Sequence, residues 1–208
     1  MRRSWQSAVG SWQELRTLRV GRWALLLTAN CLLLTLFSCQ KPELPKLFPV
    51  PAATLMNEEG ESVNLDAMKG NVVVYDFIFT NCSGTCPIMT NNMRALTPLV
   101  DDAAPVRFVS ISVDPTRDTP AVLQQYAARV RNDPRWTFLT GDRDAIVSLS
   151  VNGFKLVAGD PQPGGEALLH SSKFAVADKQ GVIRGYYDAT DGSVTKEVAT
   201  VVETLLDE

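Results

Sequence analysis

Metal-binding and nucleophilic side chains are scarce in this chain of 208 residues, which holds one histidine and four cysteines. It contains no phosphate-binding glycine loop and no Gly-x-Ser-x-Gly motif, so it gives no sign of a P-loop enzyme or a serine hydrolase. It has no internal repeat and no low-complexity tract, and no proline follows Pro163. With 45% hydrophobic and 21% charged residues, the composition is that of one ordinary globular domain, or at most two small ones.

Charge is unevenly distributed along the chain. Residues 1–38 carry five arginines and one acidic residue, Glu14, whereas the formal net charge of the whole chain is −3. The remaining residues therefore form an acidic body. Such a body argues against nucleic-acid binding and suits a soluble domain that meets a basic or metal partner.

The basic start is followed by fifteen mostly apolar residues, 23–37. This run is short for a membrane helix, which needs about 20 residues, and is typical of a signal-peptide core. It ends in Leu36-Phe-Ser-Cys39, which resembles a bacterial lipobox, so we expect residues 1–38 to be a signal peptide and Cys39 to be lipidated. An uncleaved anchor helix and plain secretion are the alternatives. In each case the body is exported to the periplasm or the exterior of a bacterial cell.

Export changes the meaning of the cysteines. Cys31 lies inside the apolar run and Cys39 would carry lipid, which leaves Cys82 and Cys86 as the thiols of the exported body. In an oxidising compartment two such thiols form a disulfide, bind a metal or need a reductant. A disulfide between residues so close in sequence adds little stability to a fold, but an idle pair or a local disulfide stays an alternative.

The exported body divides into a tether and one domain. Residues 39–53 contain four prolines and are expected to form an extended tether. Residues 54–208 alternate strand and helix patterns, which predicts an α/β domain with a thioredoxin-like fold, a mixed central sheet flanked by helices, and an N-terminal β-hairpin. The expected strands are 54–56, 62–65, 71–80, 106–113, 136–139, 173–177 and 182–187. The expected helices are 89–100, 120–131, 142–149 and 194–206.

Cys82 and Cys86 stand at the carboxyl end of the first buried strand, in the segment Cys82-Ser-Gly-Thr-Cys86-Pro87. Open α/β sheets bind their ligands at this edge. Pro87 suits the first turn of a helix, and if Cys86 opens that helix, the positive end of the helix dipole favours its thiolate. The C-x-x-x-C spacing permits a disulfide and also lets two thiolates splay around an ion.

The single histidine, His170, follows a polar loop rich in glycine and proline, 159–166, and precedes a strand of the sheet. A lone histidine is more often a surface or satisfied residue than a ligand. A mobile loop, however, would be able to bring the imidazole to the dithiol. Two thiolates and one imidazole form a soft ligand set that suits copper or zinc.

Asp114 ends the second buried strand, in the segment Asp114-Pro-Thr-Arg-Asp118-Thr-Pro120. One interpretation is that Asp114, Asp118 and Thr119 serve only strand-end and helix-cap roles. The other is that Asp114 is a carboxylate that orients the cysteine loop or tunes a bound metal. A further acidic segment, 188–192, lacks the later glutamate of a calcium loop and is expected to be a turn.

Taken together, residues 77–87, residues 112–120 and Leu169-His170-Ser-Ser resemble the Sco/SenC/PrrC family, and the resemblance extends over roughly residues 50–206. It implies a thioredoxin-like fold with Cys82, Cys86 and His170 as copper ligands, and it places Asp114 at the family's acidic position near the site. Between the cysteines this chain has Ser-Gly-Thr where many members have Pro-Asp-x.

The resemblance also implies a role. Members of that family deliver copper to the binuclear copper centre of cytochrome c oxidase, or keep the cysteines of that centre reduced. The implied cofactor is a copper ion. The implied partners are the oxidase subunit that carries the centre and a periplasmic copper donor or thiol reductant, with the membrane reached through the anchor.

The main alternative function is a thiol–disulfide oxidoreductase in which Cys82, as the more exposed thiol, attacks and Cys86 resolves. Thioredoxins share a cis-proline opposite the dithiol, and the segment before residue 173 lacks one, which argues against a plain thioredoxin. A peroxidase of the peroxiredoxin type would need an arginine near the reactive cysteine, and none is close in sequence.

Overall fold

A computed structural model describes residues 43–156, 158–159 and 169–208. The predicted leader, with Cys31 and Cys39, lies outside these residues, and so does most of the loop that precedes His170. In the part of the chain that is described, no helix combines the length and the apolar character needed to cross a bilayer.

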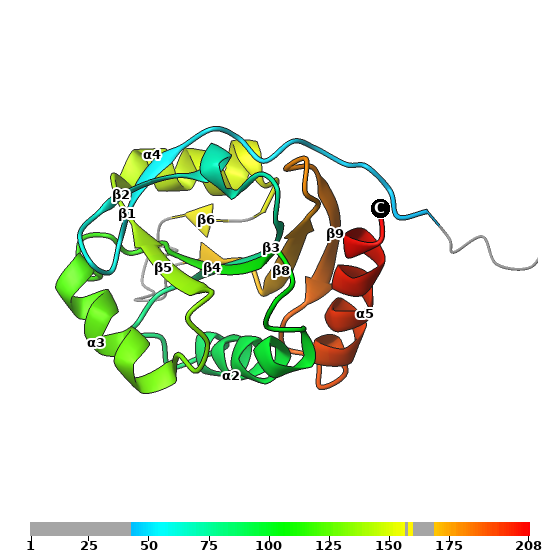
Figure 1. The fold of residues 1–208 in the computed structure, drawn as a ribbon. Helices are drawn as coiled ribbons and strands as arrows, with labels where there is room; N and C mark the ends of the chain where they lie inside the picture. Colours follow the sequence, from blue (N-terminus) through cyan, green and yellow to red (C-terminus); the bar gives the residue numbers. More distant parts are fainter. Residues whose placement is uncertain (1–42, 157, 160–168) are drawn as a thin grey trace, which may run out of the picture. The chain divides into compact units, whose positions relative to one another are not determined.

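Seven strands form one mixed sheet in the order β2-β1-β5-β4-β3-β8-β9, and β6 pairs with β7 in a separate ladder (Figure 1). The strands are β1 Thr54–Asn57, β2 Ser62–Asn64, β3 Val72–Ile78, β4 Val106–Ser112, β5 Trp136–Thr140, β6 Ala158–Gly159, β7 Leu169–His170, β8 Lys173–Ala177 and β9 Ile183–Asp188. The helices are α2 Cys86–Leu96, α3 Pro120–Val130, α4 Arg143–Ser148 and α5 Val194–Leu206, with short helical turns at Leu65–Met68, Thr97–Leu99 and Leu149–Gly153. This order confirms the predicted mixed α/β sheet.

The helices cover both faces of the sheet. Helix α2 joins β3 to β4 and α3 joins β4 to β5, and both strand pairs are parallel. Because such crossovers are right-handed, α2 and α3 lie on the same face. Helix α5 packs against α2, and Figure 1 shows α4 on the opposite side of the sheet.

Strand β3 is buried along its whole length and runs parallel to β4. A strand covered on both faces needs a nearly continuous apolar run, which is why residues 71–80 are recognisable as a central strand from sequence. Val72 pairs with Val106 at the start of the two strands, and Ile78 pairs with Ser112 at their end. The loops that follow β3 and β4 therefore leave the sheet at the same edge.

Strands β1 and β2 form the predicted N-terminal hairpin, and β1 also pairs antiparallel with β5. Asn57 closes the turn, because its Oδ1 accepts hydrogen bonds from the N–H groups of Glu59 (3.1 Å) and Glu61 (2.7 Å). Gly60 has a φ of +83° in this turn, a conformation that glycine adopts at little cost.

Helix α2 differs at both ends from the range that the apolar spacing predicts. It begins at Cys86 rather than Met89, because Cys86 already belongs to the buried face of the helix, three residues before Met89, and Pro87 fits the first turn. It ends at Leu96, and a 3₁₀ turn continues the chain through Pro98. Proline has no backbone N–H and disrupts the regular helix at this point.

The described part of the predicted tether, residues 44–53, is extended and lies against the domain. The N–H of Leu47 donates to the carbonyl of Ile183 (2.9 Å), and the N–H of Ile183 donates to the carbonyl of Phe48 (2.8 Å). The N–H of Val50 donates to the carbonyl of Gly181 (2.8 Å). Proline-rich composition predicts the extended conformation, but the attachment to β9 comes from the residues between the prolines.

Arg184, on β9, holds the start of this segment with a fully buried guanidinium. Its Nε donates to the carbonyl of Pro45 (3.0 Å), and its Nη2 donates to the carbonyl of Leu44 (2.7 Å). Its Nη1 forms ion pairs with Asp178 (3.1 Å) and with Glu208 near the chain end (2.5 Å). One side chain therefore connects β9, the docked segment and the C-terminus.

We predict that Arg184→Ala lowers the free energy of unfolding by about 3 to 5 kcal/mol, because it leaves the buried carboxylate of Asp178 without its cation. Urea unfolding followed by circular dichroism measures this loss. The control is Lys173→Ala, which removes an exposed ion pair with Asp188 and should cost about 1 kcal/mol or less. Equal losses in the two variants would contradict a stabilising role for the buried arginine.

Candidate metal centre

The loop after β3, residues 79–85, carries Cys82 and leads directly into α2 at Cys86. Pro87 occupies the first turn of the helix, as predicted. The N–H of Gly84 donates to the sulfur of Cys82 at 3.4 Å, which curls the loop back on itself. The dithiol therefore stands at the carboxyl edge of the parallel strands, the edge where open α/β sheets bind ligands.

The two thiols differ in exposure, since Cys82 is half-buried and Cys86 is buried. Burial raises the pKa of Cys86 well above its ordinary value, and a hydrogen bond with Cys82 raises it further. A backbone hydrogen bond with Phe79 opposes these effects. The expectation that the helix N-terminus favours the Cys86 thiolate is wrong, because desolvation outweighs the helix dipole here. Cys82 is the more accessible sulfur, as predicted.

A cavity of about 180 Å³ opens beside the two sulfurs, between α2 and α3. The hydroxyls of Thr90 and Tyr126 are hydrogen-bonded across its wall at 2.8 Å. The cavity is lined by Phe79, Thr80, Cys82, Cys86, Pro87, Thr90, Asn91, Tyr126 and Val130. A larger hollow of about 560 Å³, between residues 48–55 and 145–155, contains none of the predicted site residues. We therefore place the chemistry at the smaller cavity.

Asp76 lies within β3 and is fully buried. Neither of its carboxylate oxygens has a hydrogen-bond partner among the residues that the structure describes. The register places Asp76 beside Ser110, whose hydroxyl accepts a hydrogen bond from Nε1 of Trp136 (2.9 Å). Burial raises the pKa of Asp76 to about 7, against a smaller lowering effect of Ser110. The signal for this residue in the sequence is a single carboxylate inside an otherwise apolar run.

Asp118 is buried in the loop after β4 and reaches the end of β3. Its carboxylate accepts hydrogen bonds from the backbone N–H (3.0 Å) and the hydroxyl (2.5 Å) of Thr80. It also accepts a hydrogen bond from the hydroxyl of Ser112 (2.5 Å). In the sequence Asp118 resembles a helix cap, because it stands two residues before Pro120, so its long-range contact is not apparent there.

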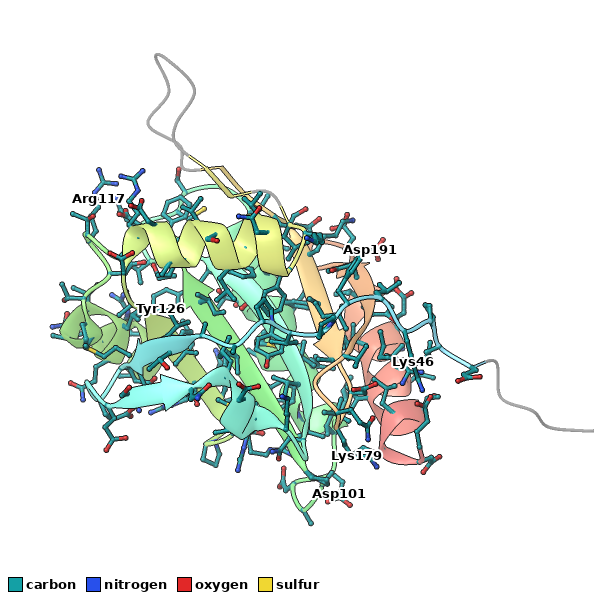
Figure 2. All side chains as sticks on the ribbon, turned by 90° about the horizontal axis from the view of Figure 1, so that it is seen from above. Lys46, Asp101, Arg117, Tyr126, Lys179 and Asp191 are labelled. Carbon is teal, nitrogen blue, oxygen red and sulfur yellow. The ribbon has the colours of Figure 1, made fainter. Side chains whose placement is uncertain are left out.

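Asp114, the acidic residue singled out from the sequence, lies at the end of β4 beside Asp118. Its backbone N–H donates to the hydroxyl of Ser112 (3.1 Å). Its carboxylate accepts a hydrogen bond from Arg117 (3.2 Å), whose side chain is 65% exposed and projects outward in Figure 2. An influence of Asp114 on a bound metal stays a prediction.

The backbone brings His170 to the edge of the sheet that carries the dithiol. His170 belongs to β7, where it pairs with Ala158 of β6. Strand β8 begins three residues later and runs antiparallel to β3, with Tyr75 opposite Ala175. The start of β8 therefore lies beside the end of β3. The side chain of His170 is not among those described, so its role as a ligand stays a prediction.

The donors at this edge of the sheet suit a soft metal ion. Cys82 and Cys86 supply two sulfur donors in mutual contact, and thiolates suit Cu(I) and Zn²⁺. Among the residues whose side chains are described, no three histidine, cysteine or acidic side chains gather into a group that could hold a metal ion. A third protein ligand would therefore have to come from elsewhere, and His170 is the candidate that the sequence predicts.

The fold consists of a parallel β-α-β-α-β unit followed by an antiparallel hairpin, and the dithiol stands at the start of the first helix. These features define a thioredoxin-like dithiol protein. The model of the SCO1/SenC family matches residues 50–207. The chain therefore belongs to the SCO1/SenC family, as the resemblance of its three segments predicts.

Similar proteins support this assignment. The chain is 32% identical over 183 residues to the SCO1 protein homolog of Bacillus subtilis strain 168, an alignment that covers 86% of this chain and 94% of the relative. It is 29% identical over 178 residues to a protein of Stutzerimonas stutzeri whose name describes it as copper-binding, covering 84% and 81%. The solved structure of BsSco, described as a member of the Sco family of cytochrome c oxidase assembly proteins, matches with a TM-score of 0.70 at 30% identity and covers 80% and 99%.

We predict that the stability of this protein decreases from about pH 4 to about pH 7, because the pKa of Asp76 is higher in the folded than in the unfolded chain. The folded state favours the protonated carboxyl, so the cost of ionisation grows across this range and is complete above it. Asp76→Asn removes the ionisation. Its free energy of unfolding should exceed that of the wild type by roughly 3 to 5 kcal/mol above neutral pH, and the advantage should vanish in acid.

Denaturant unfolding of the two proteins at several pH values from about 4 to 8 measures this difference. Asp144→Asn, at an exposed position, controls for the substitution itself. A stability difference between Asp76→Asn and wild type that stays constant over this pH range would contradict the prediction.

Proposed function

We propose that this protein is an exported, membrane-attached copper chaperone that binds copper through Cys82, Cys86 and His170. In this role it serves the assembly of the binuclear copper centre of cytochrome c oxidase. The expected partners are the oxidase subunit that carries this centre and a donor of copper or of reducing equivalents in the same compartment. Nucleic acid is not an expected partner, because the body is acidic.

The observation that carries the proposal is the pair of adjacent cysteines, Cys82 and Cys86, at the ligand-binding edge of the sheet in a member of the SCO1/SenC family. The name of the Stutzerimonas stutzeri relative, which describes copper binding, supports the choice of metal. The description of BsSco as an oxidase assembly protein supports the choice of process.

The chemistry follows from the two sulfurs and their surroundings. Both thiols lose their protons when they bind a metal, so copper uptake releases protons to solvent. Cys86 is fixed at the start of α2, whereas Cys82 is half-exposed and can be reached by an incoming ligand. Transfer would proceed by exchange, in which a partner's cysteine or histidine replaces one ligand of this protein at a time.

A second candidate function is a thiol–disulfide reductase that keeps the cysteines of a copper site reduced. The contact between the sulfurs of a half-exposed Cys82 and a buried Cys86 favours it. In such a reaction Cys82 would attack a partner disulfide and Cys86 would then displace the partner's thiol. The partner would gain two electrons and two protons, and Cys82 and Cys86 would be left as a disulfide.

Membrane attachment is part of the same proposal. The apolar segment 23–37, the lipobox-like residues around Cys39 and the proline-rich residues 39–53 are what support it. Lipid on Cys39 would anchor the chain and keep the dithiol outside the cytoplasm.

We predict that the reduced protein, purified in detergent, binds one copper ion per chain. Loss of a residue that only orients a metal ligand typically weakens metal binding by roughly 10- to 100-fold. We expect a larger loss from each of Cys82→Ala, Cys86→Ala and His170→Ala, because each removes a ligand itself. Competition against a Cu(I) chelator measures the affinity. Cu(II) loading should give a sulfur-to-copper charge-transfer band that all three variants lose.

Arg94→Ala is the matched control, since Arg94 is an exposed residue of the same helix α2 and should leave copper binding unchanged. Copper binding of normal strength in His170→Ala would contradict the three-ligand site. Absence of copper binding in the wild type, together with fast reduction of a peptide disulfide that His170→Ala leaves unchanged, would favour the reductase instead.

We predict that the wild-type protein fractionates with the bacterial membrane and incorporates labelled fatty acid, and that Cys39→Ala abolishes the incorporation because the acceptor sulfur is gone. Fractionation and mass spectrometry of the purified protein measure both effects. Cys31→Ala is the control, because it changes a cysteine in the same segment and leaves Cys39 in place. A wild-type protein that retains residues 1–38 and carries no lipid would show that the segment is an uncleaved anchor.

A further inference from the structure

The carboxylate of Asp118 connects the ends of the two central strands. It is almost completely buried, and the three groups that donate to it are neutral: the N–H and hydroxyl of Thr80 and the hydroxyl of Ser112. Hydrogen bonds to a carboxylate are shorter and stronger than those between neutral groups. Asp118 therefore adds strong hydrogen bonds between the end of β3 and the end of β4 to those of the strand pairing.

Thr80 is the residue through which this contact reaches the dithiol. It lies two residues before Cys82, and both its backbone and its side chain are bonded to Asp118, which fixes the position of the chain and its direction. The neighbouring backbone, at Phe79, forms a hydrogen bond with Cys86. The segment fixed by Asp118 thus touches one sulfur and leads directly to the other.

We propose that Asp118 is a positioning residue for the dithiol. By holding Thr80 against Ser112, it sets the separation and orientation of the sulfurs of Cys82 and Cys86. It thereby determines how tightly they bind a soft metal ion and how readily they form a disulfide. The metal part of this inference rests on the proposed function, and the disulfide part does not.

Asp114 does not fill this position in the structure. Its carboxylate contacts Arg117 within its own loop, and its N–H donates to the same Ser112 hydroxyl that Asp118 accepts from. Among the described contacts, the carboxylate that crosses from the loop after β4 to the loop after β3 is that of Asp118.

Two substitutions separate the geometry of this contact from its charge. Asp118→Ala removes all three hydrogen bonds and leaves buried donors unsatisfied. Asp118→Asn keeps an acceptor oxygen for the Thr80 N–H and the Ser112 hydroxyl, which share one carboxylate oxygen. Its amide can donate to the Thr80 hydroxyl, which can turn to accept. Asn should therefore retain the positions of the two sulfurs.

The matched control is Asp178→Ala. Asp178 is also a buried carboxylate that accepts hydrogen bonds from backbone N–H groups, those of Gln180 and Val182, but it lies in the turn between β8 and β9. Its loss should destabilise the fold without moving the dithiol. Thr80→Val provides a milder variant that removes only the hydroxyl contact, in case Asp118→Ala does not fold.

The experiment measures two quantities on the full chain. The first is Cu(I) affinity, by competition against a chelator. The second is the dithiol–disulfide equilibrium of the metal-free protein in glutathione buffers. In this reaction two molecules of reduced glutathione reduce the protein disulfide to the dithiol and become one molecule of glutathione disulfide. Unfolding free energies are recorded beside both, so that loss of stability is separated from displacement of the sulfurs.

Asp118→Ala should weaken Cu(I) binding by about 10- to 100-fold, as is typical when a group that orients a metal ligand is lost. It should also shift the thiol–disulfide equilibrium. Thr80→Val should change both quantities in the same direction by less, and Asp118→Asn should restore both. Asp178→Ala should leave both at the wild-type values.

The inference would be overturned if Asp118→Ala or Thr80→Val had the same Cu(I) affinity and the same dithiol–disulfide equilibrium as the control variant Asp178→Ala. Failure of Asp118→Asn to restore either quantity would also overturn it, since the fixed geometry would then not be the cause. If the wild type binds no copper while Asp118→Ala still shifts the disulfide equilibrium, the proposed function fails and the positioning role stands.

Discussion

The rest of the site depends on one constraint, the parallel pairing of β3 with β4 in a register that aligns the ends of the two strands. Both strands end at the same edge, with Ile78 beside Ser112, so the two loops that follow them have to lie together. Only this pairing brings Asp118 to Thr80 across the 38 residues of sequence that separate them. The burial of β3 on both faces fixes the register, because a slip would carry apolar side chains to other positions in the core.

The same burial produces the difference between the two thiols. A cysteine at a helix N-terminus usually loses its proton more easily, because the helix dipole stabilises the thiolate. Cys86 stands at such a position, yet it packs beneath the loop against the core, and desolvation raises its pKa instead. Cys82 lies in the loop before the helix and stays half-exposed. The spacing of the cysteines permits this asymmetry but does not reveal it.

Sequence patterns predicted the elements well and their contacts poorly. The apolar run at 71–80 was enough to predict β3, and the alternation of strands and helices was enough to predict a mixed sheet. The apolar spacing predicts a start of α2 at Met89, three residues late, because a cysteine before a proline does not look like the first buried position of a helix, although Cys86 is one. The role of Asp118 was missed because a residue just before a helix resembles a cap, and its partner is defined only once two strands are paired.

The asymmetry of the sulfurs bears on how a bound ion would leave. Both cysteines line the cavity between α2 and α3, but Cys82 is half-exposed and Cys86 is buried, so an acceptor reaches Cys82 more easily. Exchange would therefore begin at Cys82, with Cys86 holding the ion until a second ligand of the acceptor arrives. For that order to work, the loop around Cys82 must stay attached at its base while its outer part yields. The buried carboxylate of Asp118 provides this division, since it holds the base of the loop at Thr80 by hydrogen bonds that resist displacement, while Cys82 further along the loop stays half-exposed.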